Sequence, residues 1–152
     1  RDSAAARLVA EAVLRGDWGE GDGASAAWHG DLTFYGPGGI GLAQGAAAYR
    51  GHVLAPFRAA FEERHAEVEL LACEGNYCGA LGRLHGRGVA SWLGLPTAGR
   101  RVALRFAMHW RIVAGKAKEG WAIFDLPGLF AQLGLDFYAL AAAGQGPPGV
   151  AQ

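Results

Sequence analysis

Hydrophobic positions recur every three to four residues in two stretches of the first half of the chain. In residues 4–15 the leucines and valines fall on one side of a helix, which we expect to end at Gly16. Residues 45–64 repeat this spacing with aromatic side chains, and Pro56 within them predicts a kink or a split into two helices. Between these stretches, residues 24–29 favour a short helical turn. The first half of the chain is therefore predicted to be mainly helical.

Strand patterns dominate the second half of the chain. We expect strands at residues 32–35, 67–71, 75–84, 102–113 and 116–125. In the fourth of these, every second residue from Val102 to Ile112 is apolar, so one side of that strand packs against other elements. Residues 127–134 favour a short closing helix. Helices followed by antiparallel strands predict an α+β fold, with the helices on one face of a curved sheet.

Composition narrows the class of protein. The 152 residues, 51% of them hydrophobic, suffice for one globular domain, which we expect at residues 1–144, followed by a flexible tail at 145–152. The 14 basic and 14 acidic side chains balance, so we expect no nucleic-acid partner. No apolar stretch reaches about 20 residues and no secretory signal opens the chain, so we expect no membrane contact and a cytoplasmic location. In that compartment Cys73 and Cys78 are expected to be two reduced, buried thiols.

The turn around Gly115 decides which side chains of the last two strands share a face. If Ala114 and Gly115 form a two-residue turn, Val113 pairs with Lys116. If Gly115 instead closes a three-residue loop in the left-handed conformation, Ile112 pairs with Lys116. The second register suits Gly115 and is the one that we expect.

The expected register gathers four side chains of chemical interest on one face of the sheet. These are Arg105, His109, Trp121 and Asp125, with His109 paired to Glu119. The other register would separate His109 from Asp125, because a slip of one residue moves every side chain to the opposite face.

Asp125 is the leading candidate for catalysis. It stands at a strand end beside apolar residues, where a carboxylate is partly desolvated. A carboxylate with an imidazole nearby, such as that of His109, suffices to abstract a proton next to a carbonyl group. Asp125 also precedes Pro127 by two positions, which equally fits the N-cap of the closing helix.

Aromatic side chains could line an apolar pocket, although they are more typical of a core. They are Trp28, Tyr35, Phe57, Trp92 and Trp121. The glycine-rich segment 36–41 lacks the strand and acidic residue of a dinucleotide-binding loop. The histidines show no metal-binding spacing. We therefore expect neither a cofactor nor a metal.

Four pieces of the chain, in order, resemble the SnoaL-like polyketide cyclases of the nuclear transport factor 2-like superfamily. The pieces are Tyr35 to Gly41 followed by His52, Pro56 and Phe57; the GLPTAGR turn at 94–100; Trp110 to Lys116 with Glu119 and Trp121; and Asp125 with the QLG motif at 132–134. The resemblance covers most of residues 5–138.

This resemblance implies a cone-shaped α+β barrel, in which N-terminal helices pack on a strongly bent sheet around a pocket. It implies an enzyme of the cyclase, isomerase or lyase type that performs cofactor-independent, aldol-type acid–base chemistry on a hydrophobic, carbonyl-bearing small molecule. Asp125 and His109 would be the catalytic residues. The substrate-binding residues would be Trp28, Tyr35, His52, Phe57, Arg105 and Trp121.

The resemblance also implies a homodimer that forms through the convex side of the sheet, where Arg83, His85 and Arg87 are expected. A fold of this kind hosts several functions. The alternative is therefore a non-catalytic module that binds a small ligand or a second copy of itself.

Overall fold

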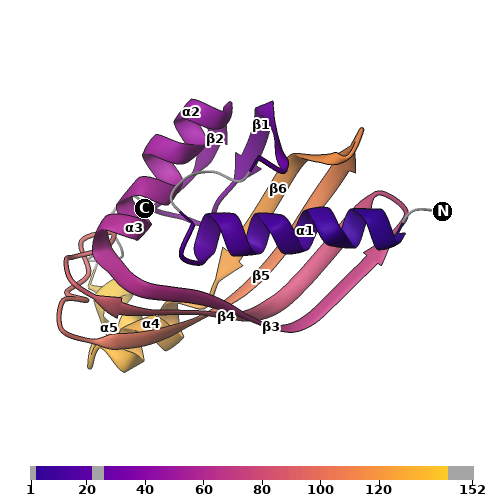
Figure 1. Cartoon of the computed structure of the whole chain (residues 1–152). Helices are drawn as coiled ribbons and strands as arrows, with labels where there is room; N and C mark the ends of the chain where they lie inside the picture. Colours follow the sequence, from indigo (N-terminus) through magenta and orange to yellow (C-terminus); the bar gives the residue numbers. More distant parts are fainter. Residues whose placement is uncertain (1–2, 22–25, 144–152) are drawn as a thin grey trace.

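The computed structural model describes residues 3–21 and 26–143, in which a long N-terminal helix lies over a bent sheet (Figure 1). In chain order the elements are α1 (Ser3–Trp18), β1 (Trp28–Tyr35), β2 (Leu42–Gln44), α2 (Ala46–Ala48), the π-helix η1 (Tyr49–Leu54), α3 (Ala55–Ala60), β3 (Phe61–Glu74), β4 (Tyr77–Gly88), β5 (Arg101–Val113), β6 (Lys116–Phe124), α4 (Leu126–Gln132) and α5 (Phe137–Ala142). The expected tail at 145–152 lies outside the described residues.

The six strands form one mixed sheet in the order β2-β1-β6-β5-β4-β3. Neighbouring strands are antiparallel except β1 and β6, which are parallel. The predicted α+β class is confirmed, and the long strands curve around α1 (Figure 1). We call the side of the sheet that faces α1 the inner face and the opposite side the outer face.

The inner face carries the hydrophobic core. Along β5, the even-numbered residues from Val102 to Ile112 are buried and the odd-numbered residues between them are more exposed, as the alternation predicts. Aromatic rings fill the space between this face and the helices: Trp18 packs edge-on against Phe57 with 5.2 Å between ring centroids, and Trp92 contacts the same ring at 5.5 Å. The interior of the cone is thus built from side chains in contact.

Three predicted helix boundaries are wrong, and burial explains the first. Helix α1 continues past Gly16 to Trp18, because the Trp18 side chain is buried and Arg58 donates hydrogen bonds to the Gly16 and Asp17 carbonyls. The second helical stretch ends at Ala60, and β3 starts directly after it at Phe61. Of the expected helical turn at 24–29, residues 24–25 lie outside the described residues, and β1 already begins at Trp28.

The β5–β6 hairpin adopts neither expected register throughout. A two-residue turn pairs Val113 with Lys116, so the expected three-residue loop is wrong. Lys118 is then an extra residue on β6, a β-bulge, after which Arg111 pairs with Glu119 and His109 with Trp121 instead of the expected Glu119. Because the bulge shifts the register by one further residue, the odd-numbered residues of both strands still share the outer face.

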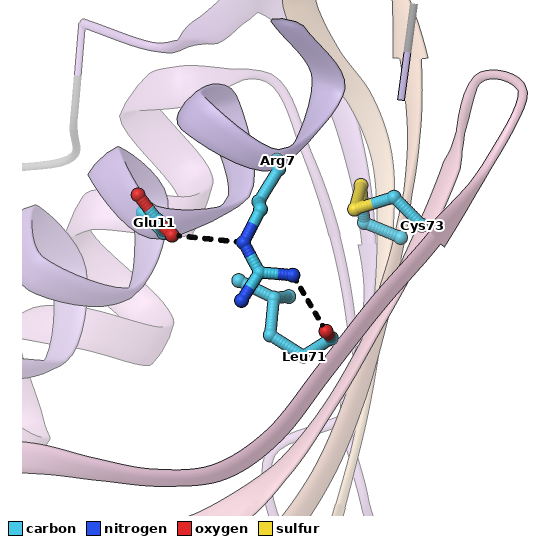
Figure 2. The surroundings of a disulfide bond; sticks show 5 residues. Arg7, Glu11, Leu71 and Cys73 are labelled. Carbon is cyan, nitrogen blue, oxygen red and sulfur yellow. Dashed lines mark hydrogen bonds and ion pairs between the residues drawn. A yellow bond between two sulfur atoms is a disulfide. The ribbon is translucent and has the colours of Figure 1, made fainter. Parts of the chain in front are cut away.

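Cys73 and Cys78 form a disulfide, so the expectation of two reduced thiols is wrong. They lie five positions apart on β3 and β4, and the tight turn at Gly75–Asn76 makes them direct cross-strand partners. The bond faces α1, close to the hydrogen bond that Arg7 donates to the Leu71 carbonyl (Figure 2). The spacing of the two cysteines does not by itself predict a disulfide. Residues five positions apart come into contact only when a tight turn lies between them.

Candidate functional site

Three rings from three strands stack on the outer face. Trp121 of β6 pairs with Tyr35 of β1 on one side and with His109 of β5 on the other. The Tyr35 and Trp121 centroids are 5.3 Å apart with planes within 10°, and the Trp121 and His109 centroids are 4.2 Å apart with planes within 8°. The register of the sheet therefore builds a continuous aromatic ladder.

A hollow of about 630 Å³ opens beside this ladder. Its walls include Tyr35, Pro37, Leu70, Leu81, Ala107, His109, Trp121 and Ile123. Most of these side chains are apolar, yet Leu70 is 54% exposed and Ile123 is 69% exposed. In this apolar hollow, the ring nitrogens of His109 are able to donate or accept a proton.

Asp125 lies on the same face but outside the hollow. Its backbone N–H donates to the Arg105 carbonyl, which places it four positions along the sheet from His109, about 13 Å away. Its Oδ1 accepts a hydrogen bond from the Gly128 N–H at 3.0 Å, so it is the N-cap of α4. Asp125 lines a shallow depression with Arg105, and the walls of this depression at Ala107 and Ile123 are shared with the hollow.

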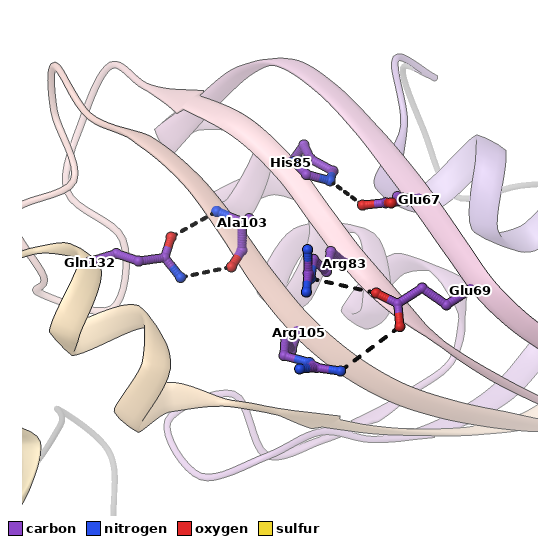
Figure 3. Close-up of polar contacts among 7 residues, drawn as sticks. All are labelled: Glu67, Glu69, Arg83, His85, Ala103, Arg105 and Gln132. Carbon is purple, nitrogen blue, oxygen red and sulfur yellow. Dashed lines mark hydrogen bonds and ion pairs between the residues drawn. The ribbon is translucent and has the colours of Figure 1, made fainter.

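A belt of ion pairs crosses the outer face next to the hollow (Figure 3). Glu69 Oε1 lies 3.5 Å from Arg83 Nε, and Glu69 Oε2 lies 3.8 Å from Arg105 Nη2. Glu67 Oε1 lies 2.7 Å from His85 Nε2, and this hydrogen bond lowers the pKa of the Glu67 carboxyl below its ordinary value. The three basic residues proposed for the convex side, Arg83, His85 and Arg87, all lie on strand β4.

The predicted site residues divide between the two sides of the sheet. The outer face brings together Tyr35, Arg105, His109, Trp121 and Asp125. Trp28 and Phe57 are buried in the core on the inner side, and His52 is exposed on η1. The eight residues therefore do not meet in one pocket. Among the described residues, no cluster of three or more His, Cys, Asp or Glu side chains could hold a metal ion.

Asp17 is a buried polar centre that the sequence analysis missed. It lies in the last turn of α1, where the helix dipole disfavours a negative charge, and it is fully buried. Trp28 Nε1 and Tyr49 Oη both donate to its Oδ2 at 2.6 Å. Burial raises the pKa of the Tyr49 phenol well above its ordinary value, and the charge of Asp17 adds to this effect. The GDW sequence at 16–18 could have indicated this centre, because it places an acidic residue at the C-terminal end of an amphipathic helix, where a negative charge is unfavourable.

Comparison with known proteins identifies the family. The sequence model of the SnoaL-like polyketide cyclase family matches residues 3–133. The chain belongs to this family. A comparison with curated protein sequences returns no match.

Solved structures share the fold of this SnoaL-like chain. TsrD from Streptomyces laurentii is 25% identical, with a TM-score of 0.72 over 88% of this chain and 98% of its own. A proposed SnoaL-like polyketide cyclase from Jannaschia sp. CCS1 is 17% identical, with a TM-score of 0.73 over 86% of this chain and 92% of its own. A Catenulispora acidiphila protein with a ketosteroid isomerase-like fold, solved with trimethylamine, is 19% identical, with a TM-score of 0.64 over 84% and 92%.

These similarities confirm the α+β fold with a helix on a bent sheet that the resemblance implied. They match the SnoaL-like chain over nearly its whole described length, with the helix on a bent mixed sheet. The resemblance also implied a pocket between the helices and the sheet, whereas aromatic rings pack together on the inner face and the hollow lies on the outer face. In the part of the chain that the structure describes, no helix has the length and apolar character needed to cross a membrane.

Proposed function

We propose that the protein performs cofactor-independent acid–base chemistry on a hydrophobic, carbonyl-bearing small molecule. The observation that carries the proposal is the apolar hollow with the His109 imidazole in its wall, held flat against Trp121. Family membership supports an enzyme of this kind. Such a hollow suits a flat aromatic ligand, which would lie along the ladder of rings.

Asp125 and His109 take different parts in this chemistry. Asp125 accepts the proton from the carbon next to the carbonyl, and His109 donates a hydrogen bond to an oxygen of the same ligand. Because about 13 Å separates the two residues along the sheet, one molecule must reach from the hollow into the depression. A polycyclic ligand is long enough to span this distance. It would lie on Ala107 and Ile123, which line both the hollow and the depression.

A proton-exchange assay tests the role proposed for Asp125 without knowledge of the natural substrate. 2-Acetylphenanthrene is a flat tricyclic ketone, and its acetyl hydrogens exchange with deuterium from D₂O when a base removes them. We expect the protein to accelerate this exchange and Asp125→Asn to slow it by about 10²- to 10⁴-fold. Asp136→Asn is the matched control, because Asp136 caps α5 in the same manner and lies outside the hollow and the depression. An undiminished rate in Asp125→Asn would exclude Asp125 as the base.

The alternative, a non-catalytic module that binds a ligand or a second copy, has its own support. Asp125 is engaged as a helix cap and stands apart from His109. The exposed apolar side chains of the hollow also suit protein association, and we propose that the protein is a homodimer. Quenching of tryptophan fluorescence by 2-acetylphenanthrene without deuterium exchange would favour the binding module over the enzyme.

A further inference from the structure

The separation between Asp125 and His109 leaves one step of the proposed chemistry without a partner. When a base removes a proton from the carbon next to a carbonyl group, negative charge develops on the carbonyl oxygen, only two bonds away. His109 is stacked on Trp121, about 13 Å along the sheet from Asp125, and side chains stand roughly perpendicular to a sheet. An oxygen bound by His109 therefore belongs to another part of the ligand, and the group that stabilises the developing charge must lie beside Asp125.

Arg105 is the residue beside Asp125 on the outer face. The Asp125 N–H donates to the Arg105 carbonyl at 2.9 Å, so the two residues stand directly opposite each other, with about 5.5 Å between their Cα atoms. Both line the depression, and among the described residues in its walls Arg105 is the only basic residue and Asp125 the only acidic one. A carboxylate and a guanidinium thus border the same small space.

The two side chains are turned to different partners. Asp125 Oδ1 accepts the hydrogen bond from the Gly128 N–H, and Arg105 Nη2 lies 3.8 Å from Glu69 Oε2 (Figure 3). Within the described part of the chain, no ion pair joins Arg105 to Asp125. A carbonyl group of a ligand can therefore lie between them, with its oxygen at the guanidinium and the neighbouring carbon at Asp125 Oδ2.

Arg105 is held more loosely than Arg111 of the same strand. Its 3.8 Å contact with Glu69 is longer than a hydrogen bond, and its side chain is 60% exposed. Arg111, in contrast, donates a hydrogen bond to Glu119 at 2.7 Å, and its side chain is 29% exposed. Because a guanidinium carries five N–H donors, Glu69 can orient Arg105 and still leave donors for a ligand oxygen.

We propose that Arg105 is a further catalytic residue, whose guanidinium stabilises the enolate oxygen that forms when Asp125 removes a proton from the ligand. The inference rests on the proposed function, because it completes the same reaction. Asp125 Oδ2 takes the proton, and the electron pair of the broken C–H bond forms a carbon–carbon double bond. The carbonyl electron pair moves onto the oxygen, which accepts a hydrogen bond from Arg105. Return of a proton from Asp125 to the carbon reverses the step.

This assignment fixes the orientation of the ligand and its chemical class. The reacting carbonyl lies over the depression between Arg105 and Asp125, while the rings lie over the hollow along the aromatic ladder. The substrate is therefore a flat ring system with an acyl group at one end. 2-Acetylphenanthrene has this arrangement, so it is also the probe for the role of Arg105.

Substitutions of Arg105 test the proposal in the deuterium-exchange assay. Arg105→Gln removes the charge and should slow exchange at saturating ketone by about 10²- to 10³-fold, the usual effect of losing one donor to a developing oxyanion. Arg105→Lys keeps a cation and should stay within about tenfold of wild type. Ketone affinity, measured by tryptophan quenching, should change by less than about threefold in both, because the ground-state carbonyl is uncharged. Added ethylguanidinium should restore exchange in Arg105→Ala.

Arg83→Gln is the matched control. Arg83 lies directly opposite Arg105 on β4 and contacts the same Glu69, but it lines neither the hollow nor the depression. Its loss should leave the exchange rate within about twofold of wild type. Because the Arg83 and Arg105 side chains are both exposed, the variants should keep the melting temperature of the wild-type protein.

The outcomes separate this inference from the proposed function. An undiminished rate in Arg105→Gln, with Asp125→Asn still slow, would overturn the role of Arg105 and leave the proposed function standing. Equal slowing by Arg83→Gln would overturn it as well, because the effect would then belong to the belt of ion pairs as a whole. A loss of ketone affinity as large as the loss of rate would assign Arg105 to binding alone. Absence of exchange in the wild-type protein, although the ketone binds, would overturn the proposed role of Asp125 and this inference with it.

Discussion

The His109 imidazole lies flat against the Trp121 indole, with 4.2 Å between the ring centroids. The contact joins β5 to β6 across the outer face, and Tyr35 continues the stack on the far side of the indole. Trp121 is thus the middle ring of three, and it orients the only imidazole that lines the hollow in the described part of the chain.

Replacing the middle ring should weaken both the stack and ligand binding. Trp121→Leu keeps an apolar side chain but removes two ring contacts, so we expect the free energy of unfolding to fall by about 1–2 kcal/mol. The affinity for 2-acetylphenanthrene should fall as well, because the ligand loses the ring that would support it. Chemical denaturation and ligand-dependent thermal shifts measure the two effects. Trp121→Tyr retains a ring and should therefore retain most of the stability and most of the ligand affinity. Equal losses in Trp121→Leu and Trp121→Tyr would argue against stacking.

The two helix caps allow the structural and chemical roles of Asp125 to be separated. Asp125→Ala and Asp136→Ala each remove a carboxylate that accepts a 3.0 Å hydrogen bond from a backbone N–H in the first turn. Each should lower the free energy of unfolding by about 1 kcal/mol, whereas the asparagine variants keep most of the cap. Only the Asp125 variants should slow proton exchange. Stability losses without any kinetic difference would leave Asp125 as a cap alone.

Tyr49→Phe should be costly although it removes only one oxygen atom. The hydroxyl donates to the fully buried Asp17 carboxylate, and a hydrogen bond to a charged group contributes about 1.5–3 kcal/mol. Urea denaturation should show a loss of this size. Tyr138→Phe is the control, because Tyr138 is 70% exposed, and it should change stability by less than about 0.5 kcal/mol.

The ion pair between Glu67 and His85 predicts a pH dependence with a definite sign. The hydrogen bond from His85 lowers the pKa of Glu67 from its ordinary value of 4.5 in the folded protein. The pair therefore stabilises the fold above about pH 4.5, and this contribution is lost as the pH falls through the lowered pKa. An NMR titration should give Glu67 a pKa below 4.5, and His85→Ala should raise it toward that value. An unchanged pKa in His85→Ala would assign the shift to another group.

The disulfide should be present in the purified protein and modest in its effect. Native protein should show no thiol that reacts with a chromogenic disulfide reagent, since the chain has two cysteines and both are paired. The bond closes a short loop, so the Cys73→Ala and Cys78→Ala double variant should lose about 2 kcal/mol of stability. Two reactive thiols in the denatured, unreduced protein would contradict the bond.

The hydrophobic periodicity was sufficient to predict the long strands. In β5, for example, apolar residues occupy every second position without interruption, so the side that packs in the core is clear. It failed where a distant partner decides the local structure. Trp18 extends α1 past Gly16 because its burial among other rings outweighs the cost of a helical glycine. The Asp17 centre depends on Trp28 and Tyr49, which no local pattern links to it.

The candidate site was also predictable only in part, because contacts between distant residues decide its structure. The expected three-residue loop placed Arg105, His109, Trp121 and Asp125 on one face; they do share it, but because a two-residue turn is followed by the bulge at Lys118, which no pattern in the sequence indicated. Alternation does not tell which face of a sheet meets the helices. The resemblance grouped Trp28 and Phe57 with the residues of the outer face, although their side chains are buried on the inner side.

The additional residue at Lys118 has a consequence for how this hairpin tolerates change in length. Lys118 forms an ion pair with Asp31, within the irregular part of β1, so it is tied to the neighbouring strand. Deleting it would remove the bulge and leave the pairing on both sides in place, because Ala117 would still face Ile112 and Glu119 would still face Arg111. Deleting Ala122, farther along the strand, would instead turn the buried Phe124 towards water and force Ile123 inward. A single missing codon would thus be absorbed at the bulge, whereas the same loss four positions later would turn the end of the last strand inside out.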